Sequence, residues 1–221
     1  MRDLAGITVI DGILIPDEQG MPAAYRDEKP VRDKYWRPGP GDVVLDIGAA
    51  VGSYTLPALL NGARVIAVDP DAEATRKLAR VASLNEVSGY QVCSAALWSS
   101  AEGYPPDMRE SLESADYPGC LIPPAAVTWL TLDQVTAVYE LDRLDWIKMD
   151  VEGAELGVLR GGTGTLTRFH PRLLIEDHTE VYPFVADMGS RRLCRELLER
   201  LNYQVEEFSW GPPSRTYLVA S

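Results

Sequence analysis

The 221-residue sequence has few cysteines and few histidines. Its three cysteines, Cys93, Cys120 and Cys194, lie far apart and form neither a Cys-x-x-Cys pair nor a Cys/His cluster. Zinc sites and disulfide frameworks need such spacings, so we expect buried or incidental thiols. The two histidines, His170 and His178, leave little choice for imidazole chemistry.

Basic residues are scarce relative to acidic ones. The chain has 21 Lys and Arg against 33 Asp and Glu, which gives a formal net charge of −12. A charge of this sign repels phosphate backbones, so nucleic acid is not an expected partner.

Long hydrophobic runs are absent as well. No segment approaches the roughly 18 apolar residues that a membrane span needs, and the first residues, Met1 to Gly6, lack a long apolar signal region. The sequence therefore predicts a cytoplasmic protein with no membrane partner. With 46% hydrophobic residues, the chain can bury a full core in one α/β domain.

What the sequence does contain is a nucleotide-binding pattern. The apolar run Val43–Ile47 includes Asp46 and leads into a turn that holds Gly48 and Gly52. A strand buried on both faces needs such a run, and glycines let the backbone bend sharply and approach a ligand. This stretch predicts the first strand and the binding loop of a nucleotide-binding sheet.

A second strand carries the matching acid. The run Arg64–Val68 is followed by Asp69, which lies 23 residues after Asp46, about the offset at which a carboxylate holds a ribose. The two strands predict an adenosine-containing cofactor. The loop lacks the complete Gly-x-Gly-x-x-Gly pattern that places a pyrophosphate on a helix N-terminus, which disfavours NAD and suits S-adenosyl-L-methionine.

Strands and helices alternate along the rest of the chain. Helices are predicted at 71–87, near 154–160 and at 190–202, and further strands at 90–97, 146–150, 172–176, 203–208 and 216–220. This order predicts a mostly parallel sheet with right-handed crossovers and a final antiparallel pair.

The chain divides into a lead-in and a main domain. Residues 1–38 are expected to form a hairpin around Asp11-Gly12, followed by a helical stretch. Residues 39–221 form the main domain. Its irregular stretch 99–126 is too long for an idle connection, so we expect a lid over the substrate.

Three sequence blocks carry a family signature: Val44–Gly52, Ile147–Gly162 and Pro171–His178. The middle block contains Lys-x-Asp-Val-Glu-Gly-Ala-Glu and is highly specific. Together, over residues 39–178, the blocks resemble the FkbM-type S-adenosylmethionine-dependent methyltransferases. That family commonly has Asn where this chain has Ala50.

The resemblance implies a fold. Class I methyltransferases have a Rossmann-like, doubly wound α/β architecture with a mostly parallel seven-stranded sheet and a C-terminal antiparallel hairpin. A family member is therefore expected to bind its cofactor at the carboxyl ends of the strands.

The resemblance also implies roles for individual residues. Asp46 and the loop from Gly48 to Gly52 are expected to face the methionine part of S-adenosyl-L-methionine, and Asp69 its ribose hydroxyls. Ser94 and Ala95 are expected at the adenine rim. The expected cofactor-binding residues are Asp46, Gly48, Ala49, Gly52, Ser53, Asp69, Pro70, Ser94, Ala95 and Asp150.

Three residues are candidates for chemistry at the methyl acceptor: His178, Asp150 and Glu176. His178 follows a predicted strand, and an imidazole that titrates near neutral pH suits removal of a hydroxyl proton. Asp150 is expected to orient His178, to act as the base itself, or to bind a divalent cation such as Mg²⁺ together with Glu176 and His178. Strand alternation also predicts an ion pair between Lys148 and Asp150.

Together with these residues, the resemblance implies an O-methyltransferase that acts on a hydroxyl of a small molecule, such as a sugar or a polyketide- or peptide-derived natural product. The substrate class follows from the resemblance alone. A NAD-dependent oxidoreductase and a non-catalytic cofactor-binding or interaction module are the alternatives. The acceptor, the methylated position, the metal dependence and the oligomeric state have no readable signal.

Overall fold

A computed structural model describes residues 5–18, 20–103, 127–178, 191–211 and 215–221. Most of the predicted lid, from residue 104 to residue 126, lies outside these described residues. None of the helices in the described ranges is long and apolar enough to cross a lipid bilayer.

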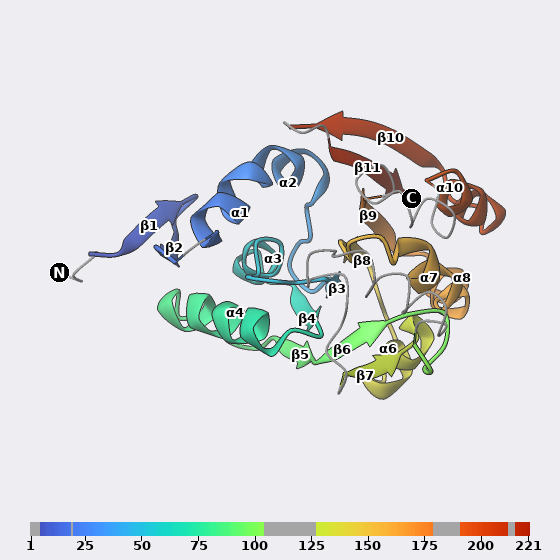
Figure 1. Cartoon of the computed structure of the whole chain (residues 1–221), viewed down its shortest axis with the longest axis horizontal. Helices are drawn as coiled ribbons and strands as arrows, with labels where there is room; N and C mark the ends of the chain where they lie inside the picture. The colour runs from blue at the N-terminus through green and yellow to red at the C-terminus, as the bar shows by residue number, and fades with distance from the viewer. Residues whose placement is uncertain (1–4, 19, 104–126, 179–190, 212–214) are drawn as a thin grey trace, which may run out of the picture.

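The centre of the fold is a sheet of seven strands, whose order is β10-β11-β9-β8-β3-β4-β5 (Figure 1). The five neighbouring strands β9, β8, β3, β4 and β5 are mutually parallel, whereas β11 runs antiparallel to both of its neighbours. The predicted α/β fold and its C-terminal antiparallel hairpin are confirmed, and the sheet is mixed. The strands are β3 (Val43–Ile47), β4 (Arg64–Val68), β5 (Gln91–Cys93), β8 (Trp146–Met149), β9 (Arg172–Asp177), β10 (Val205–Trp210) and β11 (Arg215–Ala220).

The third predicted strand, over 90–97, is wrong as a single element. Its first part is β5, which stays in the main sheet and pairs with β4 as far as the Val68–Cys93 register position. Because β4 ends at Val68, the chain loses its partner there and turns away at the exposed Ser94. The second part, β6 (Ala95–Leu97), pairs instead with β7 (Thr128–Leu130) in a separate two-stranded sheet.

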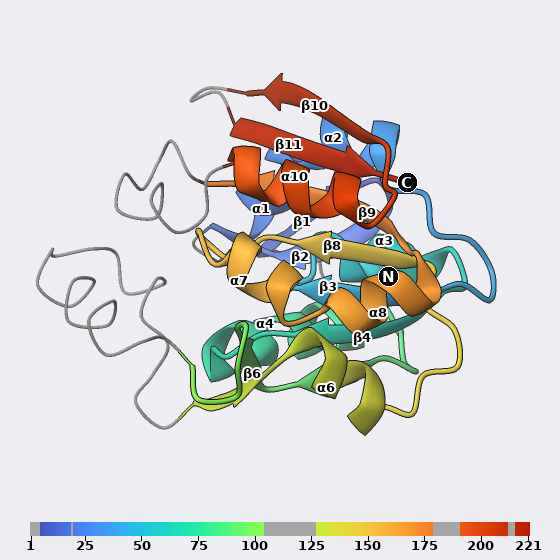
Figure 2. The ribbon, with the colours of Figure 1, turned by 90° about the vertical axis from the view of Figure 1, so that its right-hand side faces the viewer.

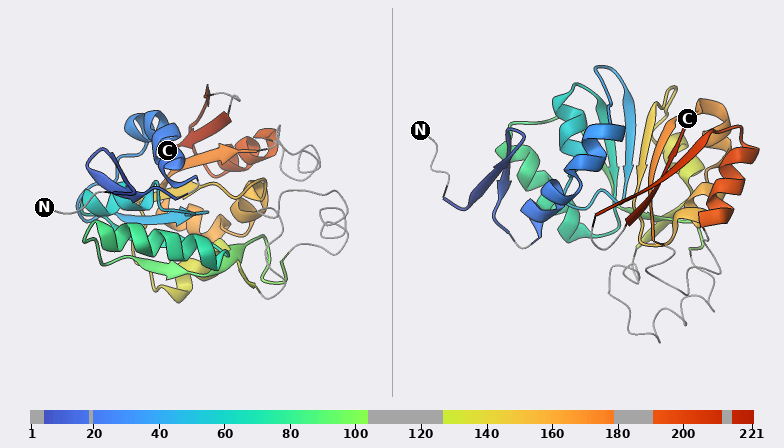
Figure 3. Two further views of the ribbon diagram at one scale, coloured as in Figure 1. Left: turned by 60° about the vertical axis from the view of Figure 1, so that its left-hand side comes forward. Right: turned by 90° about the horizontal axis from the view of Figure 1, so that it is seen from above.

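Helices cover both faces of the sheet (Figure 2 and Figure 3). One face packs against α6 (Leu132–Val138), α7 (Glu155–Arg160), α8 (Thr163–Phe169) and α10 (Arg191–Arg200). The other packs against α1 (Met21–Asp27), α2 (Lys29–Tyr35), α3 (Thr55–Leu60) and α4 (Ala72–Leu84). Helices were predicted at the positions of α4, α7 and α10, and the helical stretch predicted before residue 38 corresponds to α1 and α2. The helices α3, α6 and α8 were not predicted.

Strand alternation separates an apolar face from a partly polar one. Leu45 and Ile47 of β3 enter the core beneath α6, α7, α8 and α10, whereas Val44 enters the core beneath α2 and α3. Because successive side chains point to opposite faces, Asp46 shares the side of Val44. It stands at the same register position as Lys148 of β8, so the two buried polar residues are neighbours on that face.

The predicted N-terminal hairpin forms and packs on the main sheet's helices. Strands β1 (Ile7–Ile10) and β2 (Ile13–Pro16) are joined by Asp11 and Gly12, both at positive φ, as a two-residue type I′ turn requires. The side chain of Asn85, which follows α4, accepts a hydrogen bond from the backbone N–H of Leu14 and donates one to its carbonyl. The lead-in is thereby fixed to the layer that covers the polar face.

One close backbone contact joins β3 to β8. Gly48 has φ +79°, and a Cβ at this position would lie 1.7 Å from the backbone carbonyl oxygen of Asp150. Only glycine fits at position 48, because any side chain would push the loop after β3 away from the loop after β8.

Replacing Gly48 by Ala is expected to destabilise the fold strongly. Gly41 is the matched control, because it has φ +81° and nothing within 4 Å of an added Cβ. Gly41→Ala should lower the free energy of unfolding only through the left-handed backbone, by about 1–2 kcal/mol. Gly48→Ala has the same backbone cost and adds a clash with the carbonyl oxygen of Asp150. Urea unfolding should show Gly48→Ala to be less stable than Gly41→Ala by at least about 2 kcal/mol; equal losses would contradict this packing account.

Candidate functional site

The predicted site residues gather at the carboxyl ends of the parallel strands. The chain leaves β3 toward β4 and β5 on one side, and β8 and β9 lie on the other, so the topological switch point is between β3 and β8. The loop after β3 meets the loop after β4 through Asp69, and it meets the loop after β8 at Asp150. A ligand at this edge would touch all three loops.

The loop after β3 is held by backbone hydrogen bonds and by one carboxylate. The N–H groups of Gly48 and Ala49 both donate to the carbonyl of Val68, at 2.8 and 3.2 Å. Ala50 donates its N–H to Oδ2 of Asp69 at 2.9 Å and has φ +46°. Asn tolerates this left-handed conformation better than Ala, which gives a physical reason for the Asn that is common at this position in the family that the sequence resembles.

The second loop glycine serves packing. A Cβ on Gly52 would lie 2.3 Å from Leu78 Cδ1 and 2.9 Å from Leu56 Cδ2. The sequence suggested that Gly48 and Gly52 make room for a ligand, but the space that their missing Cβ atoms leave is filled by other parts of the chain. At both glycines, the atoms that come close to the backbone belong to this chain.

Asp69 is positioned to offer its remaining lone pairs to a ligand. Its side chain is buried, and Oδ1 accepts the N–H of Asp71 at 2.8 Å. Burial raises the pKa of Asp69, against the effect of the two backbone donors. The first turn of α4 is capped by Asp71, which accepts from Glu73, so helix capping does not use Asp69.

Asp46 lies beneath the loop rather than on its surface. It is 1% exposed, and its Oδ2 accepts a 2.5 Å hydrogen bond from the hydroxyl of Thr55. Burial raises its pKa to about 6, although the hydrogen bond from Thr55 and the charge of Lys148 both lower it. An ionised Asp46 is therefore costly, as is common for acids at functional sites.

The other cofactor candidates differ in exposure. Ser53 is buried and donates to Oε2 of Glu28 at 2.7 Å, and Ala49 is buried as well. Ser94 is exposed where the chain leaves β5, and Ala95 after it is buried. Pro70 is half-buried beside Asp69.

A buried lysine stands behind the site. Lys148 is 1% exposed, and its Nζ donates to the carbonyl of Met149 at 3.2 Å and lies 4.8 Å from the ring centroid of Tyr54. The ion pair predicted with Asp150 is present, at 3.6 Å between Nζ and Oδ2. Burial lowers the pKa of Lys148, but the surrounding carboxylates, Asp150 first, raise it above its ordinary value.

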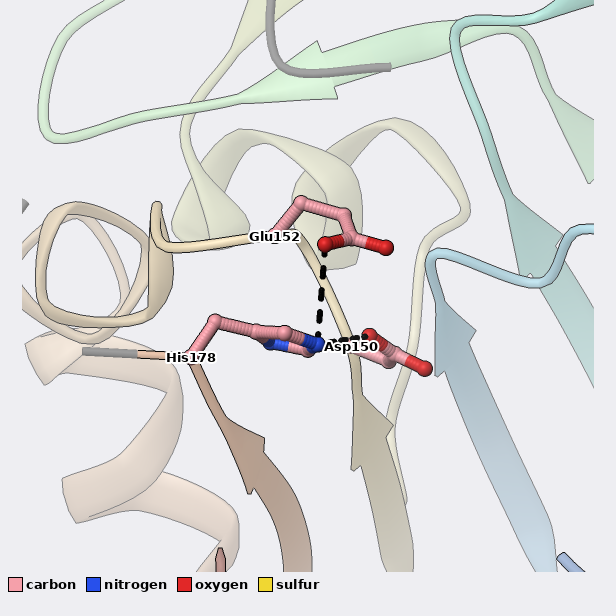
Figure 4. A group of neighbouring side chains, drawn as sticks. All are labelled: Asp150, Glu152 and His178. Carbon is pink, nitrogen blue, oxygen red and sulfur yellow. Dashed lines mark ion pairs between the residues drawn. The ribbon is translucent and has the colours of Figure 1, made fainter. Parts of the chain in front are cut away.

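His178 is surrounded by carboxylates (Figure 4). Its Nε2 lies 3.6 Å from Oδ1 of Asp150, 3.6 Å from Oε2 of Glu152 and 3.7 Å from Oε1 of Glu176. Its Nδ1 lies 3.3 Å from Oε1 of Glu155. The structure thus brings the three catalytic candidates together and adds two acids to them.

These acids change the protonation expected of His178. Burial lowers the pKa of the imidazole, but the hydrogen bond to Glu155 and the charges of Asp150 and Glu152 outweigh it and raise the pKa to about 10. The sequence argument gave His178 an ordinary imidazole pKa near neutrality. In this arrangement the ring instead carries a proton at neutral pH, because so many negative charges face it.

Glu176 is held from the C-terminal hairpin. Its Oε2 accepts a 3.0 Å hydrogen bond from the hydroxyl of Tyr217, and its Oε1 lies 3.5 Å from Nε of Arg215. Burial and the charge of Asp150 raise its pKa, while Lys148 lowers it. Two residues of β11, Tyr217 and Arg215, therefore orient Glu176, which belongs to β9.

Three acids at the site were missed by the sequence reasoning. Glu152 and Glu155 lie inside the conspicuous middle block, and their place in that block was the signal that they belong near Asp150. Glu28, between α1 and α2, had no local signal. Burial raises the pKa of Glu28 to about 7, and the charge of Lys148 opposes that rise.

The comparisons with known proteins agree with this fold. A family model for the methyltransferase FkbM domain matches residues 46–205. Among solved structures, the fold is similar to the methyltransferase FkbM from Methylobacillus flagellatus KT, with a TM-score of 0.55, 19% identity, and coverage of 86% of this chain and 46% of that chain. No protein among the curated ones matches this sequence.

Two further structures have similar folds. A SAM dependent methyltransferase from Aquifex aeolicus has a TM-score of 0.52 and 16% identity, over 92% of this chain and 93% of that one. Trm5b from Pyrococcus abyssi has a TM-score of 0.52 and 15% identity, over 97% and 54%. The chain thus spans about half the length of two of these three structures.

Replacing Asp46 by Asn is expected to stabilise the protein at pH 8 and not at pH 4. Folding raises the pKa of Asp46 from 3.8 to about 6. Its contribution to the stability of the fold is therefore fully present below pH 3.8 and is lost as the pH rises through about 6. Asn keeps an acceptor for Thr55 without a charge to bury. The shift corresponds to about 3 kcal/mol, so the melting temperature should rise by several degrees at pH 8.

The matched control is Asp142→Asn, which removes one charge from an exposed position. Thermal unfolding should show little change for this variant at either pH. A gain for Asp46→Asn that is equal at pH 4 and pH 8 would contradict the assigned burial cost.

Proposed function

Because the chain belongs to the FkbM methyltransferase family, we propose that it transfers a methyl group from S-adenosyl-L-methionine to a hydroxyl of a small molecule, such as a sugar or a natural-product metabolite. One observation carries the proposal: the loop joined to Asp69 and the cluster of Asp150, Glu176 and His178 adjoin at one edge of the sheet. This contact supports a cofactor site and a proton-handling site that lie side by side.

The residues present fit such a cofactor. Each oxygen of Asp69 accepts one backbone N–H, which leaves lone pairs for two ribose hydroxyls. Asp46 lies beneath the loop and provides a negative charge toward an ammonium group above it. S-adenosyl-L-methionine supplies an electrophilic methyl group when bound, and the chain's part is to align the acceptor with it, an effect worth up to about 7–11 kcal/mol.

The acceptor hydroxyl must also lose its proton. We propose that Asp150 accepts this proton, because its side chain is 23% exposed and the imidazole beside it, which is 11% exposed, already carries a proton at neutral pH. His178 holds the carboxylate of Asp150 in place. Lys148 and His178 lower the pKa of Asp150, against the effect of burial. Glu176, held by Tyr217 and Arg215, orients the imidazole from the opposite side.

Calorimetric titration of the purified chain should show saturable binding of S-adenosyl-L-methionine and S-adenosylhomocysteine. Asp69→Ala should weaken that binding by at least about tenfold, because two hydrogen bonds to a charged acceptor are lost. The control Asp71→Asn removes a charge two residues away and keeps an oxygen to cap α4. Absence of binding would refute the proposal, and binding of NADH in its place would favour an oxidoreductase.

His178→Ala should lower methyl transfer to a panel of sugars and hydroxylated natural products by about 10²–10⁴-fold. Cofactor affinity should change much less, because His178 belongs to the acceptor side. The control is His170→Ala, which alters a ring stacked on Tyr203 at 4.0 Å before β9 begins. Equal turnover in the His178 variant would remove this residue from the mechanism.

A further inference from the structure

Three potential ligand atoms converge just beyond the carboxyl ends of β8 and β9. One ligand atom each from Asp150, Glu152 and His178 lie within 4.8 Å of one another (Figure 4). The two distances from Nε2 of His178, both 3.6 Å, are longer than hydrogen bonds. Ligands bound at about 2.1 Å to one ion lie roughly 3–4 Å apart, so the two distances from Nε2 suit a shared cation.

A buried acid fixes which nitrogen of His178 faces this group. Oε1 of Glu155 lies 3.3 Å from Nδ1 and also accepts the N–H groups of Gly153, at 3.1 Å, and Val151, at 3.4 Å. A carboxylate oxygen cannot donate, so Nδ1 is the donor. Nε2 is then the nitrogen that faces the oxygens of Asp150 and Glu152, and a cation bound there would take the place of the proton that this nitrogen carries in the metal-free protein.

Glu155 is thus a positioning residue for both sides of the group. It is 1% exposed, and its second oxygen, Oε2, is buried without a hydrogen-bond partner in the part of the chain that the structure describes. Through one oxygen it holds the ring of His178 and the turn that presents Glu152. Carboxylate–histidine–metal arrangements have this form in proteins of many folds.

The charges around the imidazole also call for a cation. Carboxylates of Asp150, Glu152, Glu155 and Glu176 each lie within 3.7 Å of a ring nitrogen. Lys148, on the other oxygen of Asp150, and Arg215, on Glu176, offset part of this charge. Asp150 and Glu152 are the most exposed of the four acids, with side chains 23% and 36% exposed.

We propose that Asp150, Glu152 and His178 bind one divalent cation of the Mn²⁺ or Mg²⁺ class, with Nε2 and one oxygen from each acid as ligands. Carboxylate and imidazole ligands suit this class. The set differs from the one expected from sequence, because Glu152 takes the place of Glu176. The catalytic meaning of the site rests on the proposed function: a bound cation lowers the pKa of a coordinated acceptor hydroxyl.

The first test is NMR of the full chain, labelled with ¹⁵N in its two histidines, stripped with a chelator and titrated with Mn²⁺. His170 is an internal control, because it lies at the far end of β9, roughly 20 Å away by the rise of the strand. The site predicts that the His178 ring signals broaden at substoichiometric Mn²⁺ while those of His170 stay sharp. No broadening, or equal broadening of both, would overturn the proposal.

The second test is calorimetry with Mn²⁺ and Mg²⁺. Glu152→Gln should weaken Mn²⁺ binding at least tenfold, and Glu155→Gln should weaken it while shifting the Nδ1 resonance of His178. The matched control Glu206→Gln removes an exposed carboxylate from β10 and should leave affinity unchanged. Thermal unfolding verifies that each variant is folded. Unchanged Mn²⁺ affinity in folded Glu152→Gln would refute the ligand set.

The same protein samples are titrated with S-adenosylhomocysteine, so that the two hypotheses fail separately. Binding of S-adenosylhomocysteine without binding of Mn²⁺ overturns the cation site and leaves the methyltransferase proposal standing. Mn²⁺ binding that depends on Glu152, in a chain that binds no S-adenosylhomocysteine, supports the cation site and removes its proposed catalytic meaning.

Discussion

The buried ammonium of Lys148 is the charge on which the arrangement of the site depends. It lies on the polar face of the sheet, at the register position of Asp46, and it pairs with Asp150 where β8 ends. Removing one partner from a buried ion pair costs about 3–5 kcal/mol, because the other charge is left uncompensated. Several carboxylates can lie close together at this site because the positive charge of Lys148 offsets part of their negative charge.

The site is assembled from distant parts of the chain around that charge. The segment between α1 and α2 contributes Glu28, which contacts the loop after β3 through Ser53. The C-terminal hairpin contributes Tyr217 and Arg215, which hold Glu176. Segments near the two ends of the chain thus reach the same carboxyl edge of the sheet, where one contacts the loop after β3 and the other contacts the cluster around His178.

The sequence predicted most elements because their signals are local. Apolar runs located the strands, and Asp11-Gly12 located the first hairpin. The break at Ser94 was missed because it depends on where the neighbouring strand β4 ends. Helix α6 was missed although Thr131 and Gln134 form a capping box that was readable in the sequence.

The sequence by itself determined the family, the order of the strands along the chain, and the candidates Asp69, Asp150 and His178, because motifs and hydrophobic periodicity are properties of neighbouring residues. Only the tertiary structure decided how those candidates behave. The protonation of His178, and the position of Glu155 behind it, follow from charges and burial that converge from separate strands and loops. Electrostatic effects depend on distance through space, which the order of residues does not contain.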